Sequence, residues 1–450
     1  MSDKTKVSLV SLGCDKNLVD SERMLKLIYD AGYELTDDEA DAEVIVVNTC
    51  CFISDAMEES INTLIQLSEN YRTGKLKALI ACGCLAERYA DEIKKELPEV
   101  SCVIGTNSFD ELPKAIAEAL EGKAADKHRP LSGLPKARER ILSTPGHYAY
   151  LKIAEGCDKN CTYCIIPFIR GHYRSYPLED LVDEARTLAD SGVKELILVA
   201  QETTLYGIDL YGKRSLPKLI KELSEIEGME WIRLLYAYPE EITDEIIEMI
   251  RDNPKVCHYI DMPLQSGSDN ILKAMGRRTD RESVGRIINK LRENIPDICI
   301  RTTLITGFPG ETKEDHRSTL SFVEDMRFDR LGVFTFSPQE GTKAEKMPGQ
   351  VDEEVKKERL DEIMSLQQDI VFEKNRLLSE DGSLSYMVIT EGYIPEDEIY
   401  VGRTYRDAPD VDGLVFFEAK VSHMTGDMVR VRITGCNGYD LYGEEIYEFT

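Results

Sequence analysis

The stretch that most constrains this chain is a loop of three cysteines, Cys157, Cys161 and Cys164, spaced Cys-x-x-x-Cys-x-x-Cys. Three thiolates on one short loop can ligate three irons of a 4Fe–4S cube, which leaves the fourth iron with an open coordination position. A structural zinc site normally takes four protein ligands, and His172, beyond the loop, is isolated. An odd number of cysteines disfavours a disulfide framework. The loop therefore predicts an iron–sulfur cluster, with zinc or an inert loop as the alternatives.

Length and composition predict a globular protein of two to four domains. The chain has 450 residues, of which 42% are hydrophobic and 31% charged. No run of about 18 apolar residues predicts a membrane span, and the polar residues 1–6 do not resemble a signal peptide. Twelve cysteines in this context predict a cytoplasmic protein whose thiols are free or bound to metal. The net charge of −28 disfavours a generic nucleic-acid binder.

Residues 5–121 alternate short apolar segments with helix-period segments, which predicts an open, mostly parallel α/β sheet. The expected strands are 6–12, 44–48, 79–81 and 102–105. Cys14 follows the first strand, Cys50 ends the second and Cys84 follows the third. Because such sheets bind ligands at the carboxyl ends of their strands, these cysteines could converge on a second three-thiolate site. The alternative is that they are small buried residues, as we expect for Cys51, Cys82 and Cys102.

A second α/β unit follows a predicted linker at residues 122–147, where six basic residues oppose two acidic ones. Residues 148–380 contain six βα units, too few for the usual eight-stranded barrel, which predicts an open three-quarter (β/α)6 barrel. The expected strands are 150–154, 195–200, 231–236, 259–262, 299–306 and 331–336. The loop of three cysteines follows the first strand, at the end of the barrel where catalytic residues lie.

The last part of the chain has a different pattern. Residues 352–378 predict a charged helix, and residues 383–450 contain five short strand-like segments without helices. This pattern predicts a small, OB-like antiparallel β-barrel. OB-like barrels often bind nucleic acid, but here five basic residues face thirteen acidic ones. Several of these carboxylates are expected to be exposed in or near loops: Glu396, Asp397, Glu398, Asp407, Asp410, Asp412, Glu444 and Glu445.

The spacing of the three cysteines, with Tyr163 before the last one, resembles that of the radical S-adenosylmethionine (SAM) superfamily. The resemblance implies that the open iron binds the amino and carboxylate groups of SAM, and that one electron cleaves SAM to a 5′-deoxyadenosyl radical. Turns after the barrel strands would then contact SAM, although such turns are often Gly- and Pro-rich for geometric reasons alone. The candidate contacts are Tyr163, Gln201, Gln265, Gly307, Pro309 and Gly310.

The whole chain resembles the radical SAM methylthiotransferases, which end in a TRAM barrel. Leu-Gly-Cys14-Asp-Lys-Asn, Asn-Thr-Cys50-Cys-Phe-Ile and Gly-Cys84-Leu match the family's ligands to a second 4Fe–4S cluster. The resemblance implies that this cluster carries or activates sulfur, while one SAM supplies the methyl group and another the radical. No catalytic side chain beyond the cluster ligands is expected, since hydrogen-atom abstraction needs no general base.

Two branches of this family remain possible. The RimO-like branch modifies the β-carbon of an aspartate in small-subunit ribosomal protein S-twelve, and the stretches that resemble it are residues 11–22, 339–342, 347–351, 407–413 and 439–443. Asp15, where Pro is usual, and Tyr176, where Arg is expected, depart from that pattern, and residues 265–268 are closer to the MiaB-like branch, which modifies adenosine in transfer RNA.

The acidic C-terminal barrel favours a basic ribosomal protein as the partner over transfer RNA. A non-enzymatic iron–sulfur carrier is a third possibility, but it would not need a barrel of this size. An electron donor and a sulfur donor are also implied, and the sequence identifies neither.

Overall fold

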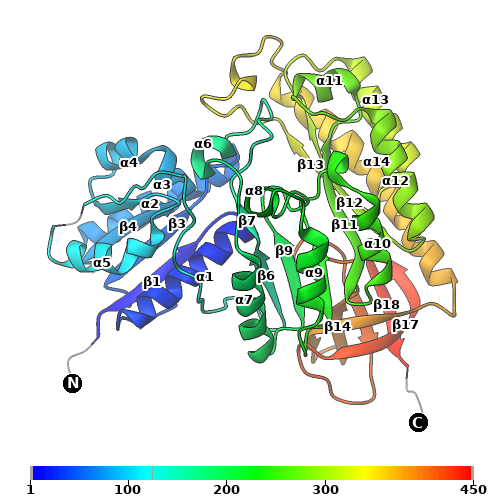
Figure 1. The fold of residues 1–450 in the computed structure, drawn as a ribbon, viewed down its shortest axis with the longest axis horizontal. Coiled ribbons are helices and arrows are strands. Elements are labelled where there is room, and N and C mark those ends of the chain that lie inside the picture. Colours follow the sequence, from blue (N-terminus) through cyan, green and yellow to red (C-terminus); the bar gives the residue numbers. More distant parts are fainter. Residues whose placement is uncertain (1–3, 75, 124, 447–450) are drawn as a thin grey trace.

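The computed structural model describes residues 4–74, 76–123 and 125–446, which form three units along the chain (Figure 1). A parallel sheet with helices comes first, a larger open barrel follows, and a small closed barrel ends the chain. These are the fold classes that the sequence predicts. Residues 1–3 of the polar N-terminal segment and residues 447–450, which include the end of the last expected strand, lie outside the described residues. Within the described residues, no helix is long and apolar enough to cross a bilayer.

The N-terminal sheet has the strand order β2-β1-β3-β4-β5, with all neighbouring strands parallel. Two apolar cores cover its faces: α1 and α5 pack on one, and α2, α3 and α4 pack on the other. The chain changes direction of winding between β1 and β3, the point at which open α/β sheets bind ligands. The elements are β1 (Lys6–Ser11), α1 (Asp15–Asp30), β2 (Glu34–Leu35), β3 (Val44–Thr49), α2 (Ser54–Arg72), β4 (Ala78–Gly83), α3 (Cys84–Arg88), α4 (Ala90–Glu96), β5 (Val100–Ile104), η1 (Phe109–Glu111) and α5 (Leu112–Leu120).

The central unit is a six-stranded parallel sheet of order β13-β12-β11-β10-β9-β6, curved into a barrel that is open between β6 and β13. Apolar side chains on its outer face pack against the surrounding helices in the largest core of the protein. The strands of this sheet are β6 (Tyr148–Lys152), β9 (Glu195–Val199), β10 (Trp231–Leu234), β11 (Val256–Gln265), β12 (Cys299–Thr306) and β13 (Arg330–Thr335). A separate antiparallel pair is formed by β7 (Ala154–Glu155) and β8 (Arg174–Ser175). The helices are α6 (Ile166–Arg170), α7 (Leu178–Asp190), α8 (Ile208–Tyr211), α9 (Leu216–Ser224), η2 (Pro239–Glu241), α10 (Asp244–Asp252), α11 (Asp269–Ala274), α12 (Arg281–Asn294), α13 (Lys313–Met326), η3 (Ala344–Lys346) and α14 (Glu353–Glu380).

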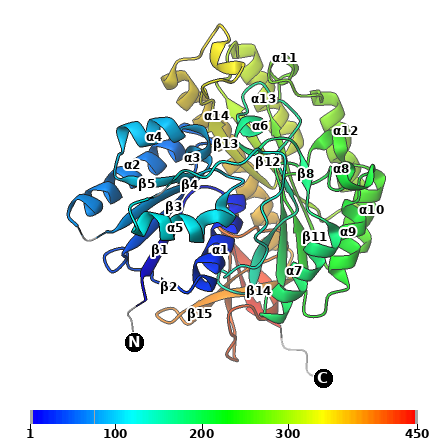
Figure 2. The same cartoon turned by 60° about the vertical axis from the view of Figure 1, so that its left-hand side comes forward.

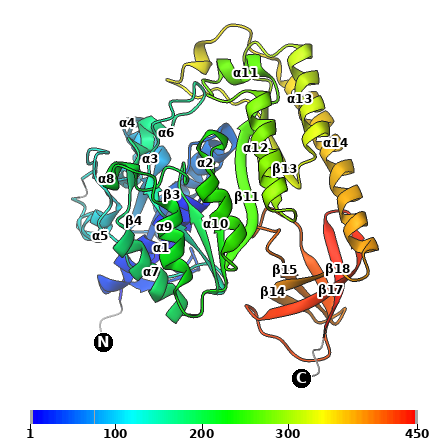
Figure 3. The same ribbon diagram turned by 45° about the vertical axis from the view of Figure 1, so that its right-hand side comes forward.

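The C-terminal barrel closes in the order β14-β15-β16-β18-β17. Its neighbouring strands are antiparallel except for β16 and β18, which are parallel. The expectation of a wholly antiparallel barrel needs this correction, because strand direction cannot alternate all the way round a closed ring of five strands. The long helix α14 leads from the central unit to this barrel (Figure 3). The strands are β14 (Ser385–Ile394), β15 (Ile399–Arg403), β16 (Val415–Glu418), β17 (Met428–Asn437) and β18 (Asp440–Glu445).

Residues 404–413, here called the floor loop, connect the C-terminal barrel to the amino ends of the central strands. The Tyr259 hydroxyl on β11 donates to Asp412 at 2.7 Å, and Arg330 on β13 pairs with Asp407 at 2.5 Å. Asp407 and Asp412 were expected to be exposed, but both side chains are buried because this loop packs against another domain. Among the other expected carboxylates, Glu445 is paired with His423 and only 11% exposed.

The N-terminal unit contacts both edges of the open side of the central barrel. Helix α1 packs against β6, where Figure 2 shows the two units side by side. At the other edge, Arg88 on α3 donates to Gln339 Oε1 at 2.9 Å, and the Ser54 and Ser337 hydroxyls are 2.5 Å apart. The segment predicted as a linker lies between the N-terminal unit and the barrel, and its Arg140 is buried in an ion pair with Glu22.

Candidate functional site

The three cysteines of the N-terminal unit lie at the carboxyl ends of neighbouring strands. Cys14 follows β1, Cys50 follows β3, and Cys84 begins α3 directly after β4. Glycine precedes two of them, with φ of +92° at Gly13 and +89° at Gly83. A Cβ on Gly13 would lie 2.7 Å from Cβ of Cys50. Glycine at this position therefore allows the first two cysteine loops to approach each other.

A pair of buried polar side chains holds these loops together. The Asn17 amide donates to the carbonyl oxygens of Leu12, at 2.7 Å, and Thr49, at 3.1 Å. Arg170 Nη2 donates to Asn17 Oδ1 at 2.8 Å and to Cys84 Sγ at 3.4 Å. These bonds fix the backbone just before the first two cysteines relative to the third.

The three thiols are close enough to influence one another's protonation. Burial, with Cys84 and then Cys14 as neighbours, raises the pKa of Cys50 to about 12. Burial also raises the pKa of Cys84, while the Arg170 guanidinium opposes the rise. Cys50 and Cys84 are buried and Cys14 is exposed. Such protonated thiols would release their protons on binding a metal.

The loop of three cysteines follows β7 at the carboxyl end of the central barrel. Cys157 and Cys161 are buried, and Cys164 is half-buried. Thr162 anchors the loop, because its amide and hydroxyl both donate, at 2.9 Å, to carbonyl oxygens at the end of α11. Burial raises the pKa of Cys157 to about 11, although the amide of Lys159, 3.5 Å from its Sγ, favours the thiolate.

One apolar cluster joins the two cysteine sites. Cys84 and Cys157 are buried in it, and Cys164 packs against it. The isoleucines of α6, a helix that begins two residues after Cys164, belong to the same cluster. The two candidate sites therefore lie next to each other across the interface between the N-terminal unit and the barrel.

The structure brings some of the candidate SAM contacts together. The Tyr163 ring lies edge-on to Phe308, with centroids 6.5 Å apart, and Phe308 stands between Gly307 and Pro309. The cysteine loop and the glycine-rich turn are therefore adjacent. The Gly307 amide is already used, since it donates to Glu311 Oε2 at 2.9 Å.

The remaining candidates are spread along the same end of the barrel. Gly310 has φ of +83° and donates to the carbonyl oxygen of Gly349 at 2.7 Å. Gln265 ends β11 with φ of +76°, and Gln201 follows β9. Neither glutamine side chain makes a hydrogen bond to the described residues, so both amides can bind a ligand.

Arg277 is a candidate that the sequence did not indicate. Its side chain is 8% exposed, its guanidinium lies 4.3 Å from the Tyr238 ring centroid, and Nη2 donates to the Pro263 carbonyl oxygen at 2.9 Å. Its Nε and Nη1 are buried without a hydrogen-bond partner in the described part of the chain. Tyr163 and Cys161 both interact with its charge. An unpaired buried cation at the cysteine loop is suited to an anionic ligand.

Glu202, which follows β9 next to Gln201, is the complementary group. It is fully buried, and burial raises its pKa to about 7, against the hydrogen bond from Thr204. Its Oε2 has no hydrogen-bond partner among the described residues and lies 3.7 Å from Nζ of Lys159, within the cysteine loop. The same loop is thus bordered by one unsatisfied acidic group and one unsatisfied basic group.

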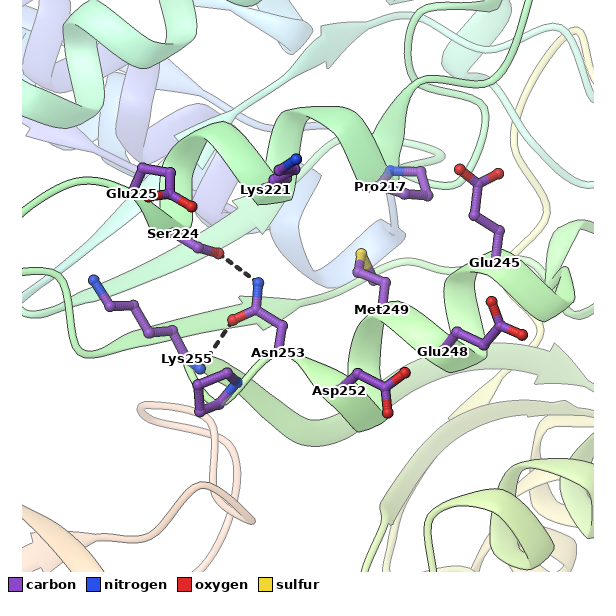
Figure 4. A pocket seen from close by; sticks show the side chains of 11 residues that line it. Pro217, Lys221, Ser224, Glu225, Glu245, Glu248, Met249, Asp252, Asn253 and Lys255 are labelled. Carbon is purple, nitrogen blue, oxygen red and sulfur yellow. Dashed lines mark hydrogen bonds between the residues drawn. The ribbon is translucent and has the colours of Figure 1, made fainter.

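A hollow elsewhere on the barrel contains none of these residues. It has a volume of about 550 Å³, lies between α9 and α10, and is lined by charged side chains such as Glu248 and Lys255 (Figure 4). No group of three His, Cys, Asp or Glu side chains in the described residues is placed to hold a single metal ion. A cube differs from such a site, because each thiolate binds a different iron.

Three family models match the chain. They are the Radical SAM superfamily over residues 151–323, the Uncharacterized protein family UPF0004 over residues 6–105, and the TRAM domain over residues 384–446. Two solved radical SAM enzymes share the fold. TsrM from Kitasatospora setae has a TM-score of 0.53 at 13% identity, covering 74% of this chain and 77% of its own. OxsB has a TM-score of 0.53 at 14% identity, covering 82% and 56%.

The open barrel and its three-cysteine loop thus define a radical SAM protein. Curated relatives named ribosomal protein uS12 methylthiotransferase RimO match nearly the whole chain. The protein from Lachnoclostridium phytofermentans is 53% identical, covering 97% of this chain and 99% of its own. That from Acetivibrio thermocellus is 49% identical, covering 99% of both chains. This chain belongs to the RimO family of radical SAM methylthiotransferases.

Proposed function

We propose that this enzyme transfers a methylthio group to the β-carbon of an aspartate in ribosomal protein uS12. The observation that carries the proposal is the placement of Cys14, Cys50 and Cys84 directly beside the radical SAM cysteine loop, through the shared apolar cluster. The names of the relatives supply the substrate.

The six cysteines have two proposed roles. Cys157, Cys161 and Cys164 hold the cluster that binds SAM, and Cys14, Cys50 and Cys84 hold a second 4Fe–4S cluster. When bound, these groups supply the radical, the methyl group and the sulfur. The interface between the N-terminal unit and the barrel brings the two sets of chemistry to one place.

Two unsatisfied side chains fit the charged ends of SAM. Arg277 has buried N–H groups without partners, which suit the carboxylate, and Glu202 has a buried oxygen without a hydrogen-bond partner, which suits the ammonium. Gln201, Gln265 and the turn at residues 307–310, with Tyr163 nearby, would contact the rest of the molecule.

We assign each of these roles to one domain of the chain. Residues 5–121 hold the sulfur-handling cluster, residues 122–147 connect the units, residues 148–380 bind SAM, and residues 383–450 form the TRAM barrel. Exposed acidic residues of that barrel, at positions 396–398, would attract the basic uS12 protein in the cytoplasm and repel transfer RNA.

The test is a comparison of two substrates. Reconstituted protein, SAM and a reductant are incubated with uS12 or with transfer RNA, and both are analysed by mass spectrometry. The proposal expects a methylthio group on one aspartate of uS12 and none on the RNA. Modified adenosine with unmodified uS12 would move the protein to the MiaB-like branch, and a failure to cleave SAM would favour a carrier.

A further inference from the structure

Arg170 is the last residue of α6 and stands six residues after Cys164 of the radical SAM loop. Its side chain is 5% exposed, and its guanidinium reaches across the domain interface. Nη2 contacts Cys84 Sγ at 3.4 Å and Asn17 Oδ1 at 2.8 Å, while Nη1 contacts Asp20 Oδ2 at 2.8 Å. A single buried cation therefore contacts one cysteine of the second site, and the asparagine that holds its loops, from the helix that follows the first site.

Arg170, Lys152 and the two carboxylates that they pair with carry balanced charges without the cysteine. Lys152 pairs with both Asp20 and Glu155, and Glu155 lies 3.5 Å from Arg170. Two cations thus face two carboxylates, and all four side chains are buried. A thiolate at Cys84, with the negative charge of a cluster held by three thiolates, would add anionic charge to a neutral group of residues. Arg170 is the cation in direct contact with that sulfur.

We propose that Arg170 is a positioning residue for the second cluster. Arg170 donates a hydrogen bond to the Cys84 sulfur and thereby raises the reduction potential of that cluster. The inference rests on the proposed function, because it requires Cys14, Cys50 and Cys84 to hold a cluster. The physical reason is that a donor on a ligating sulfur withdraws electron density and favours the reduced, more negative state of the cluster.

Helix α6 gives the same contact a second role. It has five residues, and only Ile165 separates it from Cys164. Movement of the first cysteine loop, for example when SAM binds, would therefore be transmitted by a short rigid element to the sulfur of Cys84.

The test uses the full chain with Cys157, Cys161 and Cys164 replaced by Ala, so that the second cluster alone remains. Its midpoint potential is measured by a redox titration followed by electron paramagnetic resonance. In this background, Arg170→Gln should shift the potential to a more negative value. Arg170→Lys keeps the charge but cannot bond to Cys84, Asn17 and Asp20 together, so its shift should be smaller and in the same direction.

Arg23 supplies a matched control. It is as deeply buried as Arg170 in the same interface, pairs with Glu184 at 3.0 Å and bonds to the Tyr176 hydroxyl at 3.0 Å, but it contacts no cysteine. Arg23→Gln should reduce stability and leave the potential unchanged. Equal potentials in the parent, the Arg170→Gln and the Arg170→Lys proteins would overturn the inference, as would an equal shift in Arg23→Gln.

Failure of the proposed function gives a different result. A parent protein that binds no iron after reconstitution would show that the second cluster does not exist. If Arg170→Gln alone loses its iron, the Arg170→Lys protein decides the question by its potential.

Discussion

Replacing Arg277 with Gln tests whether the buried guanidinium binds the carboxylate of SAM. The change keeps a polar, although shorter, side chain but removes the charge and the unpaired N–H groups of Nε and Nη1. A hydrogen bond to a charged group contributes about 1.5–3 kcal/mol. Loss of one such bond should therefore weaken SAM binding roughly 10- to 150-fold.

Folding should respond differently from binding. In the described residues Arg277 has no ion-pair partner, so burying its charge lowers the free energy of unfolding. The contact with the Tyr238 ring offsets this loss in part. Removing the charge relieves that cost while it removes the ring contact. We expect the melting temperature of cluster-free Arg277→Gln to stay close to that of the wild type, whereas a purely structural arginine would give a clear loss.

The measurement is the dissociation constant of SAM, obtained by equilibrium dialysis against reconstituted protein with equal iron content. Arg278→Gln is the matched control, because Arg278 is adjacent and exposed. The Arg278→Gln protein should bind SAM with the same dissociation constant as the wild type. An unchanged dissociation constant in Arg277→Gln would refute the assignment of this residue to SAM.

Three other predictions concern the second cluster and the C-terminal barrel. Reconstituted protein should hold about eight irons, and replacing Cys14, Cys50 and Cys84 with Ala should leave about four and preserve SAM cleavage; unchanged iron content would contradict the second site. Glu195→Gln should cost about 3–5 kcal/mol in denaturant unfolding, because it leaves the buried Arg233 and Arg403 without their shared carboxylate, 2.7 and 2.8 Å away. These arginines lower the pKa of Glu195 against the effect of burial, so its contribution should be present at neutral pH and lost as pH falls through the lowered pKa; equal acid sensitivity in the variant would argue against this. Replacing residues 396–398 with Lys should slow association with uS12 at low salt, measured by stopped flow, and a rate independent of these charges would exclude the docking role.

The cysteine positions could be predicted because they follow from rules of parallel sheets. Cys14, Cys50 and Cys84 come at strand ends, and the strands of such a sheet present those ends on one edge. The order of the strands then decides which ends are neighbours. The structure adds that the glycines before Cys14 and Cys84 both have positive φ.

The arginines could not be predicted, because their partners are distant in the sequence. Arg170 contacts Cys84, which is 86 residues earlier, and no local pattern marks either member of the pair. Arg277 lies in a polar turn after α11 and is buried by Tyr238. The departures at Asp15 and Tyr176 have similar explanations, since Asp15 accepts a hydrogen bond from Tyr236 of the barrel and Tyr176 accepts one from Arg23.

Two carboxylates of the C-terminal barrel were predicted to be exposed, and this prediction was wrong. Asp407 and Asp412 stand in a segment whose composition is typical of an exposed loop. They are buried because the amino ends of the barrel strands present Arg330 and Tyr259 to them. Exposure at these two positions depends on another domain, which composition alone does not reveal.

The floor loop limits how this enzyme can be recombined with its relatives. A chimera that takes its C-terminal barrel from another family member would also import residues 404–413, and with them the groups that neutralise Arg301 and Arg330 inside the catalytic barrel. The boundary for a successful exchange therefore does not coincide with the boundary of the small barrel. Grafts should retain the loop of the parent barrel, or carry the facing positions of β11, β12 and β13 along with the tail.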